Sequence, residues 1–175
     1  MREFARNKLH LLCKVRMLMT NRTCCFFGHR AITESAQLRK KITDAVEKLI
    51  TEHGVDTFLF GSKSRFDSLC LEMVTALKES HTHIKRIYVR AEFPVIDEDY
   101  TAYLLQCYDE TYFPERLLKA GRAVYVERNR EMINRSRYCI VCYDPSYTPA
   151  ARKSGTKIAL DYAVRKERQI ILLSP

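Results

Sequence analysis

The residues best suited to chemistry lie near the end of the chain. Arg128 and Asn129 precede an apolar run at 138–143, and Ser154-Gly155-Thr156 opens a segment with helical periodicity. A cationic side chain, an amide and a glycine turn are therefore expected beside the ends of adjacent strands. Open α/β sheets bind phosphorylated ligands at that position. The spacing predicts a nucleotide site.

Gly28 and Gly61 mark two further turns of the same kind. Each follows a short apolar run and precedes a segment whose apolar residues recur at helical spacing. Glycine lets backbone N–H groups approach an anion, and the dipole of the following helix favours negative charge there. We therefore expect an anion-binding crevice. Its predicted residues are Gly28, His29, Arg30, Gly61, Ser62, Lys63, Asp67, Arg128, Asn129, Ser154, Gly155 and Thr156.

Some of these residues also have a purely structural interpretation. Ser64 and Asp67 have the spacing of a helix capping box, with Asp in place of Glu, so both could serve only a helix end. Asn129 could cap a helix that carries Met132. The alternative to an anion site is a set of turns and caps without a ligand.

Two further groups are open to more than one interpretation. Tyr100, Tyr103 and Tyr108 share one face of a helical pattern, where they could stack on a base, although such spacing is more typical of core packing. The acidic triplet at 97–99 could hold a divalent ion, but adjacent carboxylates without a partner motif are typical of a solvated face. We predict neither a metal nor a cofactor.

The cysteines bear on compartment and on metal binding. Seven cysteines without a secretory pattern favour a reducing compartment, and we expect a cytoplasmic protein. Cys139 and Cys142 lie in one predicted strand, where positions three apart point to opposite faces of the sheet. We therefore expect both to be small buried apolar residues, not a metal pair.

Short apolar runs alternate with helical patterns along the chain, and these elements must position the residues above. Strands are predicted at 24–27, 57–60, 84–89, 123–126, 138–143 and 169–173. This alternation indicates an α/β fold with a doubly wound, mostly parallel sheet of five to six strands and helices on both faces. The segment 91–121 has the least regular pattern.

Length and charge limit the possible partners. The 175 residues suit one domain, which we place at 23–175, after a basic leader at 1–22 that is either flexible or an extension from an upstream start. Residues 1–18 carry a net charge of +4 out of the total of +9, so the domain itself is only modestly basic. A small anion suits it as well as a polyanion. No apolar segment approaches the roughly 20 residues of a membrane span, so no membrane partner is expected.

An ordered series of short motifs resembles the SLOG superfamily, the Rossmann-like group that includes the DNA-processing protein DprA and the LOG phosphoribohydrolases. The series is similar above all to the bacterial YpsA-like branch of unknown function. This resemblance implies a Rossmann-like domain that binds nucleotides or their derivatives. The motifs are Cys-Cys-Phe-Phe-Gly-His-Arg at 24–30, Phe-Gly-Ser-Lys-Ser-Arg-Phe-Asp at 60–67, Tyr-Asp-Glu-Thr-Tyr-Phe-Pro at 108–114, Glu-Arg-Asn-Arg-Glu-Met at 127–132 and Ser-Gly-Thr at 154–156.

The departures from that family concern catalysis and backbone approach. Ser62, Arg65 and Ser154 stand where members of the branch usually have glycine. Arg128 matches the arginine of the LOG-type hydrolases, but Ala159 stands where their glutamate acts on the N-glycosidic bond. Without a placed carboxylate much of the expected catalysis is lost. The resemblance thus implies binding more than hydrolysis.

Three functions follow as hypotheses. The first is a module that binds, and so senses, a nucleotide or nucleotide-derived small molecule, with a homodimer expected because exposed apolar helix faces often pair subunits. The second is an N-glycosidase, phosphoribohydrolase or deoxyribosyltransferase that uses Asp67 or Asp161 in place of the glutamate. The third is a DprA-like nucleic-acid binder, which the scattered basic residues do not favour.

Overall fold

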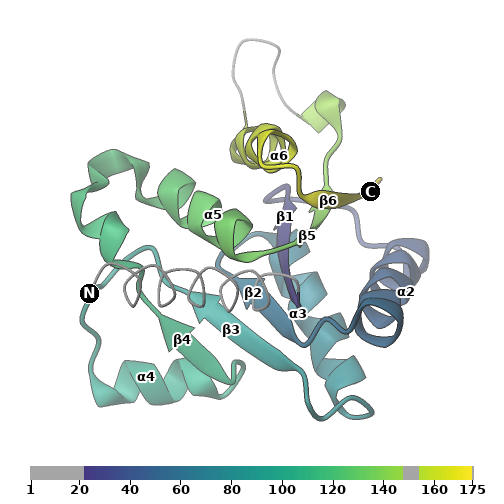
Figure 1. The fold of residues 1–175 in the computed structure, drawn as a ribbon, viewed down its shortest axis with the longest axis horizontal. Coiled ribbons are helices and arrows are strands. Elements are labelled where there is room, and N and C mark those ends of the chain that lie inside the picture. Colours follow the sequence, from purple (N-terminus) through teal and green to yellow (C-terminus); the bar gives the residue numbers. More distant parts are fainter. Residues whose placement is uncertain (1–21, 148–153, 175) are drawn as a thin grey trace, which may run out of the picture.

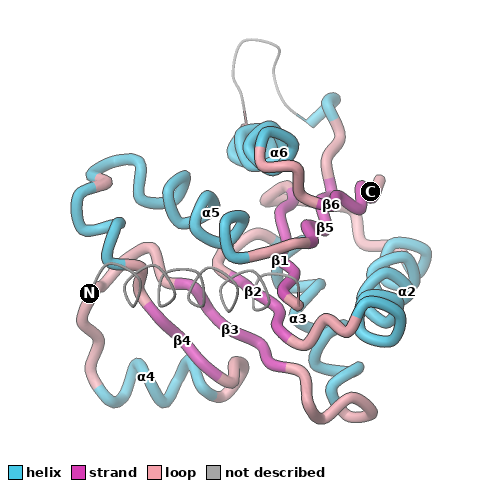
Figure 2. Tube along the Cα trace, in the orientation of Figure 1, coloured by secondary structure: helices cyan, strands magenta, loops and turns pink. Residues whose placement is uncertain are grey.

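The computed structural model describes residues 22–147 and 154–174, so nearly all of the predicted leader lies outside the described residues. Six strands form one sheet in the order β4-β3-β2-β1-β5-β6, and every neighbouring pair is parallel (Figures 1 and 2). The strands are β1 (Thr23–Gly28), β2 (Thr57–Phe60), β3 (Lys85–Val89), β4 (Glu110–Tyr112), β5 (Tyr138–Cys142) and β6 (Gln169–Leu173).

Helices connect these strands and cover both faces of the sheet (Figure 1). They are α2 (Ala36–His53), α3 (Arg65–Lys78), α4 (Glu98–Leu105), α5 (Val124–Arg135) and α6 (Gly155–Arg165), with short 3-10 turns η1 (Glu115–Lys119), η2 (Gly121–Ala123) and η3 (Pro145–Tyr147). The predicted fold class, a Rossmann-like α/β fold, is confirmed. No helix among the described residues has both the length and the apolar character needed to cross a membrane.

Alternate residues of the central strands enter two separate hydrophobic layers. Cys24 and Phe26 of β1 pack with the buried faces of α2 and α3. Cys25 and Phe27, their neighbours on the same strand, pack with α5 and α6. This alternation follows from the period of two in a strand, and burial on both faces explains why β1 is an uninterrupted apolar run.

The cysteines of the central strands follow the same rule. Cys139 lies in the layer under α5 and α6, whereas Cys142 lies in the layer under α2 and α3, as their spacing predicted. Cys25 and Cys139 are register partners on β1 and β5, and their Sγ atoms are 3.5 Å apart. The thiols at these positions act as small apolar side chains in the core.

The strand order reverses direction at β1. From β1 the chain moves through β2, β3 and β4 to one edge, then returns to place β5 on the other side of β1, with β6 beyond it. In a parallel sheet such a reversal leaves a crevice at the carboxyl ends of the strands, because the connecting helices diverge to opposite faces. The fold therefore places the turns after β1, β2 and β5 at one edge.

The prediction of a strand at 123–126 is wrong. Ala123 ends η2, and Val124 begins α5, which continues to Arg135. The short run of β-branched and aromatic residues there sits at the start of an amphipathic helix, and tertiary packing overrides its strand propensity. Asn129 consequently lies inside α5 and does not cap it. The structure instead has an edge strand at β4, which has no apolar run to identify it.

Several helix starts have side-chain caps, of which the sequence predicted that of Ser64. Ser64 caps α3 by accepting a hydrogen bond from the Asp67 backbone N–H at 3.1 Å, and Ser154 caps α6 in the same way. The reciprocal half of the capping box at α3 is absent, because the Ser64 N–H donates to Ser62 Oγ at 3.0 Å. Asp97, the first residue of the acidic triplet, caps α4. Its carboxylate therefore has a structural role.

Candidate functional site

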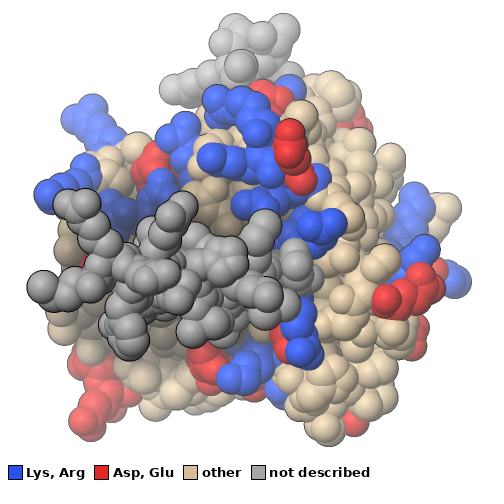
Figure 3. All heavy atoms as spheres, in the orientation of Figure 1, with Lys and Arg blue, Asp and Glu red and all other residues tan. Residues whose placement is uncertain are grey.

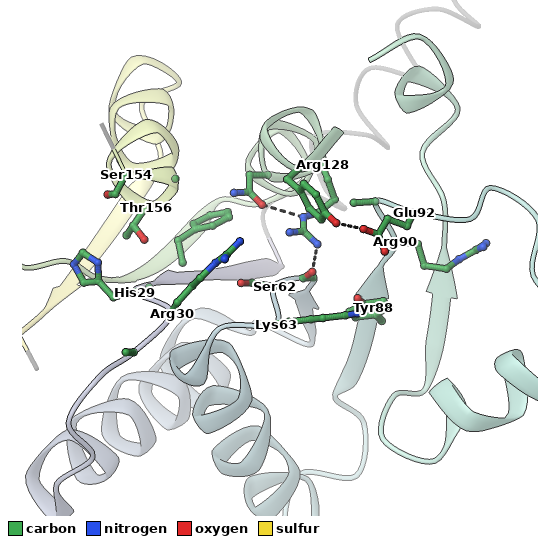
Figure 4. A pocket seen from close by; sticks show the side chains of 18 of the residues that line it. His29, Arg30, Ser62, Lys63, Tyr88, Arg90, Glu92, Arg128, Ser154 and Thr156 are labelled. Carbon is green, nitrogen blue, oxygen red and sulfur yellow. Dashed lines mark hydrogen bonds between the residues drawn. The ribbon is translucent and has the colours of Figure 1, made fainter. Parts of the chain in front are cut away.

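A cavity of about 790 Å³ opens at the carboxyl edge of the sheet (Figure 4). Its lining comes from the turns after β1 and β2, the segment after β3, one side of α5 and the start of α6. This volume falls within the roughly 300–1,000 Å³ typical of small-molecule sites. All of the predicted site residues line the cavity except Asp67, which is buried beneath it.

One side of the cavity is formed by the start of α6 and the turns after β1 and β2. We call this side the rim and define it as Arg30, Lys63, Ser154, Gly155 and Thr156. The two cationic side chains are solvent-exposed. A Cβ added at Gly155 would meet nothing within 4 Å, so this turn is open. The first N–H groups of a helix lack intrahelical partners and favour an anion. The rim therefore combines backbone donors with positive charge.

His29 holds the turn after β1 in place at the edge of the rim. Its Nε2 accepts a hydrogen bond from the Asp144 backbone N–H at 3.0 Å, and its ring stacks on Tyr143 with 5.5 Å between centroids. The side chain is buried. His29 thus links the end of β1 to the residues after β5, in addition to lining the cavity.

The bottom of the cavity is closed by Gly61, Asp67 and Arg128, which we call the floor. Arg128 is only 3% exposed. Its guanidinium donates to the carbonyl oxygens of Gly61 and, at 3.3 Å, of Val89, while its Nε donates to Asn129 Oδ1 at 2.9 Å (Figure 4). Arg128 therefore joins α5 to the ends of β2 and β3. The sequence identified this arginine as a site residue but not these partners.

Asp67 is a buried carboxylate under the floor's arginine. Its Oδ1 has no hydrogen-bond partner among the described residues. Burial raises the pKa of Asp67 to about 7, although the nearby charge of Arg128 and the backbone N–H groups of Gly61 and Ser62 act in the opposite direction. The same burial lowers the pKa of Arg128, and the charge of Asp67 opposes that change. The two groups thus interact electrostatically inside the protein, shielded from solvent.

The far end of the cavity contains four aromatic residues, of which the sequence offered only Tyr100 as a possible base platform. Tyr88, Phe93, Tyr100 and Tyr125 line it, and we call them the aromatic end. The tyrosine at 100, which could have been either core or base platform, lies in the cavity wall, whereas Tyr108 packs against the core. The segment after β3 lies at the same sheet edge as the glycine turns. That position in the fold could have indicated a site segment, but the segment was not recognised because it contains no glycine turn.

Ala159 and Asp161, two of the three positions connected with catalysis, lie away from the cavity. Ala159 is 2% exposed and belongs to the hydrophobic layer between α6 and the sheet. A side chain at 159 therefore points to the core. Asp161 pairs with Lys157 on the outer side of α6 and does not line the cavity. Among the described lining residues the one carboxylate is that of Glu92, which accepts a hydrogen bond from Tyr125.

The charge of the lining is positive. Arg30, Lys63, Arg90 and Arg128 face a single acid, Glu92. No group of three or more potential metal ligands occurs among the residues that the structure describes. The lining thus has the composition of a site for an anion.

Comparison with known proteins gives no family for the chain. No protein-family model matches it, and no curated protein matches it. The resemblance of its motifs to the SLOG superfamily therefore stays a hypothesis.

Proposed function

We propose that the protein binds a nucleotide or a nucleotide-derived ligand, with the phosphate at the rim. The observation that carries this proposal is the open turn at Gly155, where the N-terminus of α6 and two exposed cationic side chains face one cavity. Backbone N–H groups and charged donors together give the short, strong hydrogen bonds that phosphate oxygens accept. The resemblance to the SLOG superfamily supports the same ligand class.

Within this proposal Arg128 supports the site without contacting the phosphate directly. Its contacts with the carbonyl oxygens of Gly61 and Val89 keep the turns after β2 and β3 in place, and its charge adds to the positive potential of the cavity. Positive charge in a concave site attracts anionic ligands, and a partly desolvated environment strengthens that attraction. The direct phosphate contacts are assigned to Arg30, Lys63 and the first N–H groups of α6.

The lining favours binding over hydrolysis. Cleavage of an N-glycosidic bond is aided by a carboxylate placed near the ribose. Glu92 is hydrogen-bonded to Tyr125 and lies across the cavity from Thr156 in Figure 4. Asp67 is buried and does not line the cavity, so its carboxylate is not placed beside a bound ribose.

The surface charge also favours a small anion over a nucleic acid. Figure 3 shows Lys and Arg gathered over α5 and α6, with acidic side chains between them. Arg116, Arg130 and Arg135 each pair with a glutamate of α5, and Lys157 pairs with Asp161. Paired charges give a weaker field than an uninterrupted basic stripe, which is the usual footprint for a polyanion.

Titration calorimetry with AMP, GMP, CMP and UMP tests the proposal. We expect at least one of these nucleotides to bind the full chain. Arg30→Gln and Lys63→Gln should each lower the affinity for that nucleotide by about tenfold or more, because each removes a charge-assisted hydrogen bond. Lys48→Gln serves as the matched control, since this exposed lysine lies on α2 and does not line the cavity.

Two results would contradict the proposal. One is the absence of binding by all four nucleotides. The other is binding that is equally tight in the rim variants and in the control. Release of free base from a bound nucleotide, measured by chromatography, would instead support the enzyme hypothesis.

A further inference from the structure

The cavity has two chemically different ends. His29, Arg30 and Thr156 lie on one side of Arg128 in Figure 4, and Tyr88, Arg90 and Glu92 lie on the other. The first side carries the open helix start and the exposed Arg30. The second carries the four rings of the aromatic end together with Arg90, and the Lys63 side chain extends toward Tyr88 in Figure 4. A ligand that fills the whole cavity must therefore be anionic at one end and compatible with aromatic rings at the other.

Phe93 is the most unusual residue of the aromatic end. Its φ is 55°, and its side chain is 60% exposed. The left-handed conformation is sterically unfavourable for a bulky residue. An exposed ring also lacks the favourable free energy of burial. Glu167, in the turn after α6, is the other non-glycine residue with positive φ in the described part of the chain. A strained conformation persists only where surrounding contacts enforce it, and such positions gather at functional sites.

The surrounding contacts do enforce it. The Arg90 Nη1 donates to the Phe93 carbonyl oxygen at 2.6 Å, which fixes the turn from within the cavity wall. The Tyr125 hydroxyl donates to the carboxylate of Glu92, the residue before Phe93, and so joins the start of α5 to the same turn. The backbone is thus held in place while the ring stays exposed.

Two rings of the aromatic end, Phe93 and Tyr100, contact each other, and Tyr103 extends the pair. Phe93 meets Tyr100 edge to face, with 6.4 Å between centroids and 83° between the ring planes. Tyr100 stacks in turn on Tyr103, at 6.1 Å and 11°. These are favoured aromatic geometries, and they fix ring orientation. Tyr125 is 52% exposed, so neither it nor Phe93 serves the core.

We propose that the aromatic end receives the base of the nucleotide, which stacks on the exposed ring of Phe93 and meets Tyr100 edge to face, while the phosphate lies at the rim. This inference rests on the proposed function and adds the determinant that selects a nucleotide over a sugar phosphate. Aromatic side chains stack on any base, because every base has a π-face. The site therefore accepts purine and pyrimidine nucleotides and discriminates against phosphates that lack a base.

Titration of the full chain with the four nucleoside monophosphates and with ribose 5-phosphate tests this inference. Phe93→Gly relieves the strained backbone, so this variant should melt at the wild-type temperature or above it. Its affinity for the nucleotides should nevertheless fall by at least about fivefold, with ribose 5-phosphate binding unchanged. Phe93→Tyr keeps a ring and should bind as the wild type does. Glu167→Gly, the matched control, relieves similar strain and should not alter binding.

The outcomes separate this inference from the proposed function. If nucleotides bind but Phe93→Gly binds them as tightly as the wild type, the inference is overturned and the phosphate site stands. The same conclusion follows if ribose 5-phosphate binds as tightly as the best nucleotide, or if Phe93→Tyr loses as much affinity as Phe93→Gly. If neither nucleotides nor ribose 5-phosphate bind, the proposed function and this inference both fail.

Discussion

The floor and the rim of the cavity each contain a strand-to-helix glycine, but the two glycines have different surroundings. In the floor, a Cβ at Gly61 would overlap the Arg128 guanidinium, which already occupies the space beside the backbone. In the rim, the corresponding space at Gly155 is open. Gly28 follows the floor's pattern, because a Cβ there would overlap the Phe66 ring. A glycine turn can therefore accommodate the protein's own side chains or leave room for a ligand.

The cationic residues of the cavity differ in the same way between floor and rim. Arg128 donates hydrogen bonds to two backbone carbonyl oxygens and to Asn129, and its charge interacts with the buried carboxylate of Asp67. Arg30 and Lys63 are exposed at the mouth. We therefore expect loss of stability when the floor is altered and loss of ligand binding when the rim is altered.

The largest expected effect is on the floor's arginine. Arg128→Met removes a buried cation that interacts electrostatically with Asp67, and it removes the donor to two backbone carbonyl oxygens. Each buried carbonyl group left without its donor costs about 1–3 kcal/mol, so we expect a loss of about 3–5 kcal/mol of unfolding free energy. Arg135→Met is the matched control on the same helix. Arg135 is 54% exposed and paired with Glu131, so its loss should cost less than about 1 kcal/mol. Urea unfolding measures both changes.

A second substitution sharpens this result. If Asp67→Asn is added to Arg128→Met, part of the lost stability should return, because no carboxylate is then left buried without its cation. Equal costs for Arg128→Met and Arg135→Met would mean that the floor is not closed by internal contacts. Arg128 would then be a ligand residue like those of the rim.

The next largest effect is expected at Gly28. The methyl group of Gly28→Ala would overlap the ring of Phe66, which is fully buried in α3 and has no space to move into, so we expect a loss of about 3 kcal/mol. Gly155→Ala adds the same methyl group to the open turn and should change stability by less than about 1 kcal/mol. Thermal unfolding of the two variants compares them directly. A similar loss in both would remove the distinction between packed and open turns.

The smallest of the three effects depends on pH. Because the pKa of Asp67 is raised to about 7 from the ordinary 3.8, the folded state holds this proton more tightly than the unfolded state. The resulting stabilisation is complete below about pH 4 and is lost as the pH rises through about 7. Asp67→Asn lacks this loss, so relative to wild type it should gain about 2 kcal/mol between pH 5 and pH 8.

Unfolding at several pH values between 5 and 8 measures this gain. Asp44→Asn, at an exposed residue of α2, is the control and should give a difference from wild type that changes little with pH. A flat difference for Asp67→Asn as well would show that the buried carboxylate does not change its protonation on folding over this range.

The sequence predicted those strands that have a signal in their own residues. β1, β2 and β5 are buried on both faces, so each appears as an uninterrupted apolar run. β4 could not be found in this way, because Glu110–Tyr112 is a short edge strand that depends on pairing with β3. The run at 123–126 was misassigned because strand propensity is outweighed by the packing of α5 on the sheet.

The same division applies to the candidate site. Glycine turns and cationic residues are visible in the sequence, and the structure places them around one cavity. The role of Arg128 was not visible, because its carbonyl partners are 67 and 39 residues away along the chain. Tyr100 was a possible base platform from its spacing, but Phe93 was missed because its turn is defined by a backbone angle and by the hydrogen bond from Arg90, not by a motif.

The cysteines of the central strands make unfolding of the sheet accessible to a chemical label. Cys24, Cys25 and Cys139 of these strands and Cys70 of α3 have no exposed surface, whereas Cys107 is exposed. Alkylating reagents attack the thiolate, and burial also raises the pKa of Cys24, Cys25 and Cys70 well above the usual value. Among the cysteines that the structure describes, Cys107 is therefore modified first in the native protein. The slower modification of the strand thiols reports how often the sheet opens.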